Sequence, residues 1–275
     1  MKFRQKTAAC LVLAFFTAAV GATGCSKKLT PKKLMDEMSQ NMAEVTSFSS
    51  AVEMDIKLEE VLYSTEVSLD MTLENTTEPK AGHARGTANV EMRGVSLSST
   101  LEIYQVIEDG EAITYSSIDN LWSRQTEQNS GTSGFSVDGN LFQNMQDSLD
   151  TFSIAEQPVE VDGRECWQMY GNVTGASLIG LLGEDMMNAY GLVDIPDQDA
   201  VAGLTFPIIV EVYKEEVLPA RFLIDMTDVM DSLYEEYGES MKVNDFTIRL
   251  QFNGYNQAAE IIVPQEIRDA AGIQY

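Results

Sequence analysis

The sequence predicts an α+β protein built around a long antiparallel sheet, and two patterns predict that fold class. The first is an alternation between residues 48 and 58, where even positions are mostly apolar and odd positions mostly polar. That period is typical of a strand with one buried face. The second is a helical spacing of apolar side chains just before that strand, at Leu34, Met35, Met38 and Met42. A helix leading into a strand is therefore expected from the start of the folded part.

The helix has a favourable beginning, because Thr30 suits the N-cap position and Pro31 the first helical position. The alternation resumes in four further segments, at residues 61–73, 84–92, 95–107 and 111–117. We expect Glu59-Glu60 to join the first two strands, and the turns after them to contain Gly82, Gly94 and Gly110. Such a meander normally leaves one face of the sheet to water.

The second half of the chain predicts helices alternating with strands. Apolar spacing favours helices at 141–152, 176–190 and 229–237, and a last helix starting at Pro264. Strands are expected at 159–161, 165–170, 206–213, 220–226 and 245–255. The expected organisation is one β-rich domain at 31–275 with helical insertions at about 135–155, 175–192 and 227–238.

The first 24 residues predict a signal peptide. Three basic residues precede an apolar run at 8–20, which is too short for a stable membrane span but suits a signal. The segment Ala22-Thr23-Gly24-Cys25 resembles the lipobox of bacterial lipoproteins, although Ala22 stands where Leu is usual. That resemblance implies cleavage before Cys25, a lipid on its thiol, and a short linker at 25–30. An ordinary secretory signal or an uncleaved anchor is the alternative.

Composition excludes several classes of function. Removing the three basic residues of the signal leaves 15 basic against 43 acidic residues, a charge of −28, which argues against nucleic-acid binding. Cys10 leaves with the signal and Cys25 carries lipid, so Cys166 has no partner for an internal disulfide. We expect Cys166 to be a buried, unreactive residue of a strand.

Catalytic and metal-binding patterns are weak. His83 is the only histidine, so a Ser-His-Asp triad would depend on it, and its glycine-rich surroundings predict an exposed turn. A zinc site would lack ligands. Calcium could bind Asp194, Asp197 and Asp199, but their spacing does not fit the EF-hand loop, and this question stays open. We expect no cofactor and no enzymatic activity; a hydrolase using paired carboxylates is a distant alternative.

The arrangement resembles the LolA-like half-barrel lipoproteins, including the LppX/LprG type. The resemblance rests on three segments, which are Leu34–Leu58, Val161–Met169 (VDGRECWQM) and Leu218–Asp225 (LPARFLID). It implies a curved antiparallel sheet with helices packed in its concave face. It also implies a lipid or other apolar ligand between the sheet and the helices.

We therefore expect a lipid-anchored protein on the extracytoplasmic face of the cell membrane that binds or shuttles an apolar ligand, with 176–190 as its gate. The expected cavity is lined by Met54, Ile56, Leu69, Met71, Leu178, Leu182, Met186 and Met187. The alternative is a non-enzymatic interaction module with a filled core and an acidic face that binds a protein. A single-membrane envelope is favoured, but the sequence leaves the envelope type, the ligand, any protein partner and the oligomeric state open.

Overall fold

The computed structural model describes residues 29–127, 145–182 and 198–272. Within them the strands form one curved, open antiparallel sheet of 12 strands, so the predicted fold class is confirmed. The strands are β1 (Ser47–Glu59), β2 (Ser64–Thr77), β3 (Lys80–Met92), β4 (Val95–Glu108), β5 (Glu111–Ile118), β6 (Leu121–Glu127), β7 (Ser153–Ile154), β8 (Val159–Val161), β9 (Arg164–Thr174), β10 (Thr205–Tyr213), β11 (Pro219–Asp225) and β12 (Lys242–Tyr255).

The sheet consists of two wings that meet where the first strand pairs with the last. The strand order is β6-β5-β4-β3-β2-β1-β12-β11-β10-β9-β7, with β8 paired to β9. One wing is the predicted meander, and the other contains the later strands. At the junction Val52 pairs with Leu250 and Met54 with Ile248, so apolar side chains of both wings lie on the same face.

Two faces are distinguished throughout. The inner face contains the even positions of β1 from Phe48 to Leu58, and all of these except Ser50 belong to the main hydrophobic core. The outer face contains the odd positions, such as Glu53 and Asp55, which are polar. The alternation in the sequence therefore corresponds to the two sides of one sheet.

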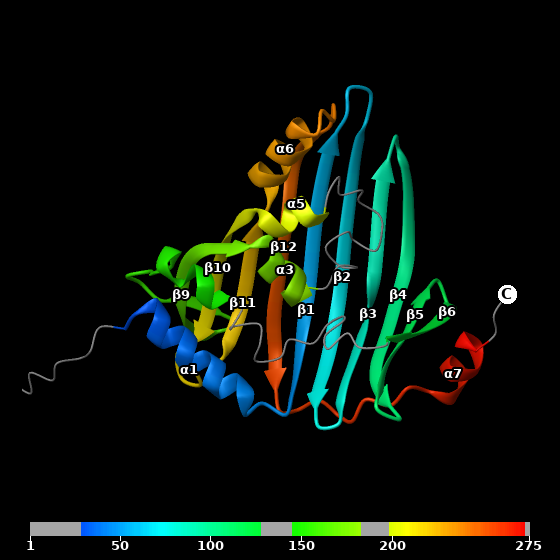
Figure 1. The fold of residues 1–275 in the computed structure, drawn as a ribbon, viewed down its shortest axis with the longest axis horizontal. Coiled ribbons are helices and arrows are strands. Elements are labelled where there is room, and N and C mark those ends of the chain that lie inside the picture. The colour runs from blue at the N-terminus through cyan, green and yellow to red at the C-terminus, as the bar shows by residue number, and fades with distance from the viewer. Residues whose placement is uncertain (1–28, 128–144, 183–197, 273–275) are drawn as a thin grey trace, which may run out of the picture.

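The helices are α1 (Pro31–Ala43), the 3₁₀ helix η1 (Gln146–Thr151), α3 (Gly175–Leu182), α5 (Gln198–Gly203), α6 (Thr227–Glu236) and α7 (Gln265–Ala271). In Figure 1, α1, α3, α5 and α6 lie in front of the sheet, on the side of β9–β12 and β1. Their buried side chains join the inner-face core, including Leu34 of α1, Leu178 of α3 and Met230 of α6. No helix in the described ranges is long and apolar enough to cross a membrane.

The start of α1 follows the predicted capping. Thr30 Oγ1 accepts a hydrogen bond from Lys33 N at 3.3 Å, and Pro31 occupies the first turn. The four apolar residues predicted for this helix, Leu34, Met35, Met38 and Met42, are all buried. The helix is thus held to the sheet by the stripe that predicted it.

The C-terminal helix α7 covers a different surface. Its Ile267 and Ala271 pack with Tyr104, Ile113 and Tyr115 in a separate cluster. Tyr104 pairs with Tyr115 across β4 and β5, whereas the inner-face residues of β4 are the alternate ones, such as Ile103. Helix α7 therefore lies on the outer face of the meander.

Several sequence predictions were wrong in detail. Gly82 and His83 lie inside β3 and not in a turn, because the preceding hairpin already reverses at Glu78 and Pro79. The exposed-turn prediction for His83 is also wrong, since its ring is half-buried and stacks on Tyr104 at 4.1 Å between centroids. The strand β6 and the short helix α5 were not predicted.

Candidate functional site

The inner face brings together the described part of the predicted cavity lining. Met54 pairs with Leu69 across β1 and β2, and two residues further along β2, Met71 pairs with Val52. Met54, Ile56, Leu69, Met71 and Leu178 are all buried and belong to one apolar cluster. Leu182 is the last residue of α3, while Met186 and Met187 lie outside the described residues.

Methionine is unusually abundant in this cluster. Nine of the 14 methionines of the chain belong to it, namely Met35, Met38, Met42, Met54, Met71, Met145, Met169, Met226 and Met230. Methionine is unbranched and adaptable, so it can repack around apolar groups of different shape. A sheet face and several helices contribute to the same deformable core.

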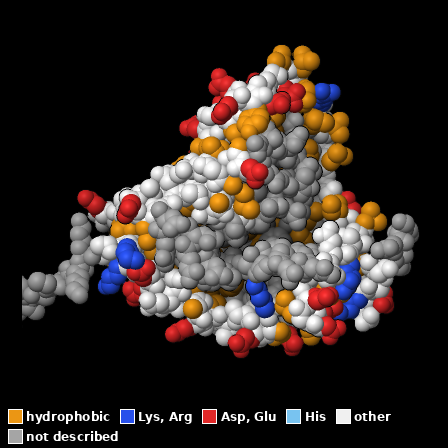
Figure 2. Space-filling model, viewed as in Figure 1, with side chains coloured by type: hydrophobic (Ala, Val, Ile, Leu, Met, Phe, Trp, Pro, Cys, Tyr) orange, Lys and Arg blue, Asp and Glu red, His pale blue; other side chains and the backbone are white. Residues whose placement is uncertain are grey.

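The inner apolar face continues beyond the buried region, toward the hairpin ends of β1–β4. Val90 pairs with Leu97 and Met92 with Val95, on the same face as buried Ala88. Leu97, Val95 and Met92 are nevertheless exposed, and so are Val61 (84%) and Leu62 (89%) in the neighbouring β1–β2 hairpin. Figure 2 shows apolar side chains gathered at this end, at the top of the view. We call these five residues the apolar rim.

Two polar atoms of the inner face lack partners. Ser50 Oγ and Asn75 Nδ2 are the buried side-chain nitrogen or oxygen atoms without a hydrogen bond in the described part of the chain. The side chains of Ser50 and Asn75 are 0% and 6% exposed. The hydroxyl of buried Ser47, by contrast, accepts a hydrogen bond from Ala258 N at 3.1 Å.

A groove of about 490 Å³ lies on the outer face and was not predicted. One row of side chains crosses five strands there: Glu53, Arg249, Leu223, Ile209 and Tyr170 are successive partners from β1 to β9. The next row places Thr247 between Asp55 and Asp225. The groove therefore has apolar residues toward β9 and β10 and carboxylates toward β1.

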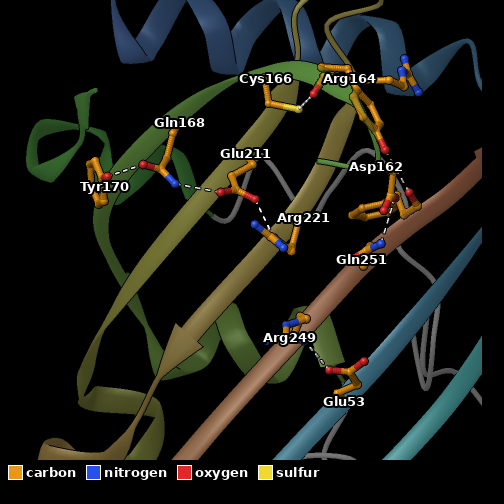
Figure 3. Close-up of polar contacts among 12 residues, drawn as sticks. Glu53, Asp162, Arg164, Cys166, Gln168, Tyr170, Glu211, Arg221, Arg249 and Gln251 are labelled. Carbon is orange, nitrogen blue, oxygen red and sulfur yellow. Dashed lines mark hydrogen bonds and ion pairs between the residues drawn. The ribbon is translucent and has the colours of Figure 1, made fainter. Parts of the chain in front are cut away.

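A polar network borders this groove (Figure 3). Glu211 is 1% exposed; it accepts from Arg221 Nε at 2.6 Å and from Gln168 Nε2 at 2.8 Å. Tyr170 OH donates to Gln168 Oε1. At the other side Arg249 Nη1 pairs with Glu53 at 2.7 Å. The buried carboxylate is compensated by its partners, so the network orders the groove wall.

Within the described residues, Cys166 and His83 lie on different strands, β9 and β3, and share no reactive centre. Cys166 is fully buried in β9, and desolvation raises the pKa of its thiol to about 11, so it stays protonated at neutral pH. His83 Nε2 lies 2.9 Å from Glu102. Within the described ranges no three His, Cys, Asp or Glu side chains are placed to hold a metal. Asp199 is exposed at the start of α5; Asp194 and Asp197 lie outside those ranges.

The curved, open sheet with helices packed against one face defines the class of fold, a half-barrel. The chain is similar to the crystal structure of LprF from Mycobacterium bovis, with a TM-score of 0.51, 13% identity, and coverage of 85% of this chain and 96% of LprF. It also aligns with the lipoprotein LppX of Mycobacterium tuberculosis, at a TM-score of 0.42, 14% identity, and coverage of 84% and 99%. The similarity to LprF confirms the predicted half-barrel fold.

Family membership follows from the sequence itself. Residues 30–272 match the model of DUF6612, a family of unknown function, and the chain belongs to that family. A search of curated proteins gave no match.

Proposed function

We propose that this protein is a lipid-anchored, non-enzymatic protein of the cell envelope that binds an apolar ligand, a lipid, between the inner face of its sheet and its methionine-rich helices. The anchor would be a lipid on Cys25, placing the domain on the extracytoplasmic side of the cell membrane. Two lipid chains on one thiol suffice for stable anchoring.

One observation carries this proposal: the apolar side chains of the inner face extend from the buried core to the exposed apolar rim, with Ser99 of β4 as a polar residue among them. Contiguous exposed apolar surface is uncommon on soluble monomers and usually marks an interaction or ligand-binding surface. An acyl chain that entered over Leu97 and Val95 would meet mostly apolar side chains, including Val90, Ala88 and Leu101. Burial of that chain would supply about 25 cal/mol per Å² of apolar surface.

The test is native mass spectrometry of the chain secreted with Cys25→Ala, followed by solvent extraction of whatever it carries. A stoichiometric lipid adduct is expected. A clean protein mass, unchanged after incubation with total membrane lipid, would refute lipid binding.

The outer groove favours a second candidate, the docking of a cationic partner segment. Asp55 and Asp225 lie on either side of Thr247 and form no ion pair within the described residues. The apolar side chains of Ile209 and Leu223 lie beside them. Chemical crosslinking in intact cells tests this candidate: a partner crosslinked to the wild type and lost with Asp55→Asn and Asp225→Asn together would support it. Unchanged crosslinks would reject it.

A further inference from the structure

We infer that Ser50 and Asn75 form a polar pair that hydrogen-bonds an uncharged oxygen of the ligand, such as an ester or a hydroxyl, inside the otherwise apolar inner face. This inference rests on the proposed apolar-ligand site and adds a specificity determinant to it. Its basis is the pair of unpartnered buried atoms, Ser50 Oγ and Asn75 Nδ2.

The two side chains lie close together. On β1, Ser50 is paired with Leu73 of β2, and Asn75 is two residues further along β2 on the same face, opposite Phe48. Diagonal neighbours of this kind in an antiparallel pair are about 7 Å apart. One oxygen-bearing group can therefore contact both side chains.

Their surroundings are apolar and aromatic. Ser50 is also paired with Phe252 of β12, whose ring is 5.9 Å from that of Phe48 and 5.5 Å from that of Phe222. Each of these rings is buried in the inner-face core. Because a buried polar group without a hydrogen bond is destabilising, two adjacent ones need a reason, and a ligand atom supplies it.

The backbone makes room for the amide. Asn75 is opposite Gly82 on β3, and a Cβ at Gly82 would lie only 3.2 Å from Asn75 Oδ1. The strand thus lacks a side chain where the Asn75 amide lies over it. This explains why a glycine that looked like a turn residue stands inside a strand.

The chemistry of the pair indicates an uncharged partner. A serine hydroxyl and a carboxamide can each donate and accept, and neither carries charge. The buried polar residues of the described chain include no Lys or Arg, so an anionic headgroup would find no countercharge beside Ser50. An ester or hydroxyl oxygen needs none.

The experiment compares two probes that differ only in the oxygen-bearing group, decylpyrene and methyl pyrenedecanoate. Binding of each is measured by pyrene fluorescence to the chain secreted with Cys25→Ala and stripped of lipid. The test variants are Ser50→Ala and Asn75→Leu. Ser49→Ala is the matched control, because Ser49 directly precedes Ser50 on β1 and belongs to the outer face.

We expect the wild type and the Ser49→Ala control to bind the ester more tightly than the hydrocarbon. Each test variant should weaken ester binding by about three- to tenfold, the range of one hydrogen bond, and leave hydrocarbon binding unchanged. The free Ser50→Ala protein should unfold at the same or a higher temperature than wild type, since it loses an unsatisfied group. This readout separates a ligand-binding role from a structural one.

The outcomes that overturn the inference are distinguishable from failure of the proposed function. If wild type binds both probes equally, or if the variants keep its preference, the polar pair is refuted while apolar binding stands. If neither probe binds, the apolar site is refuted and the polar pair with it. A lower unfolding temperature for Ser50→Ala would show that Ser50 has a structural partner, and this too would overturn the inference.

Discussion

Replacing Gly171 by Ala should destabilise the protein through a single steric conflict on the inner face. A Cβ at Gly171 would lie 2.5–2.6 Å from three atoms of the Phe152 ring, Cγ, Cδ1 and Cδ2. Carbon atoms in contact prefer about 3.5–4 Å, so the ring has to move by about 1 Å. It cannot move freely, because Phe152 N bonds to Leu149 O at 3.1 Å and the next residue, Ser153, pairs with Tyr170.

The magnitude follows from two opposing effects. Overpacking of a core costs about 1–3 kcal/mol, while removing a glycine from a strand gains about 0.5–1 kcal/mol. The net loss for Gly171→Ala is therefore about 1–2 kcal/mol. In a Phe152→Ala background the three ring atoms are gone, and Gly171→Ala should become neutral or slightly stabilising. The expected coupling energy is about 2 kcal/mol.

The assay is urea unfolding of the chain secreted with Cys25→Ala, followed by far-ultraviolet circular dichroism, for the wild type, both single variants and the double variant. Unchanged m-values would show that the unfolding transition is comparable across the four proteins. Additive free energies, with Gly171→Ala costing the same in both backgrounds, would refute the packing of Phe152 against β9.

Three further predictions follow from the described contacts and from the lipobox. Gly175→Ala should separate α3 from α5, since its Cβ would lie 1.8 Å from the carbonyl oxygen of Val201; faster hydrogen exchange in both helices would show it, and unchanged protection would contradict it. The folded protein should lose stability between about pH 9 and 11, because burial raises the pKa of Cys166 from 9.0 to about 11 and the thiol of the unfolded chain therefore releases its proton at lower pH. In Cys166→Ala the free energy of unfolding should not show this decrease. An equal decrease in both proteins would mean that another group causes it. Cys25→Ala should abolish incorporation of labelled palmitate and release the protein from membranes, whereas a variant that stays membrane-bound would refute the lipid anchor.

The sequence predicted the sheet well where alternation was strong and failed where glycine was ambiguous. The first strand was expected at 48–58 and is Ser47–Glu59, because one face of it is fully buried. Gly82 suggested a turn but lies inside β3. In the same strand a Cβ at Gly86 would lie 1.9 Å from Asp70 O. Close approach between strands and a chain reversal both require glycine, and one sequence does not separate these causes.

The two candidate sites differed in how far they could be predicted. The inner-face residues Met54 and Leu69 could be found from the apolar–polar alternation alone, since every second residue of a half-buried strand lies on the same face. The outer groove could not, because its row from Glu53 to Tyr170 depends on the register between five strands. The unpartnered state of Ser50 and Asn75 likewise depends on their neighbours in space and leaves no trace in the sequence.

The pairing of the first strand with the last has a consequence for how the protein folds. Asn244 Nδ2 donates to Glu59 Oε2 at 2.9 Å, although 185 residues separate them. Such distant pairings slow folding, because a long loop must close before any contact forms. A chain synthesised from its N-terminus therefore keeps one edge of β1 unpaired until β12 has emerged. Loss of β12 would leave two half-sheets, each with an open strand edge prone to aggregation.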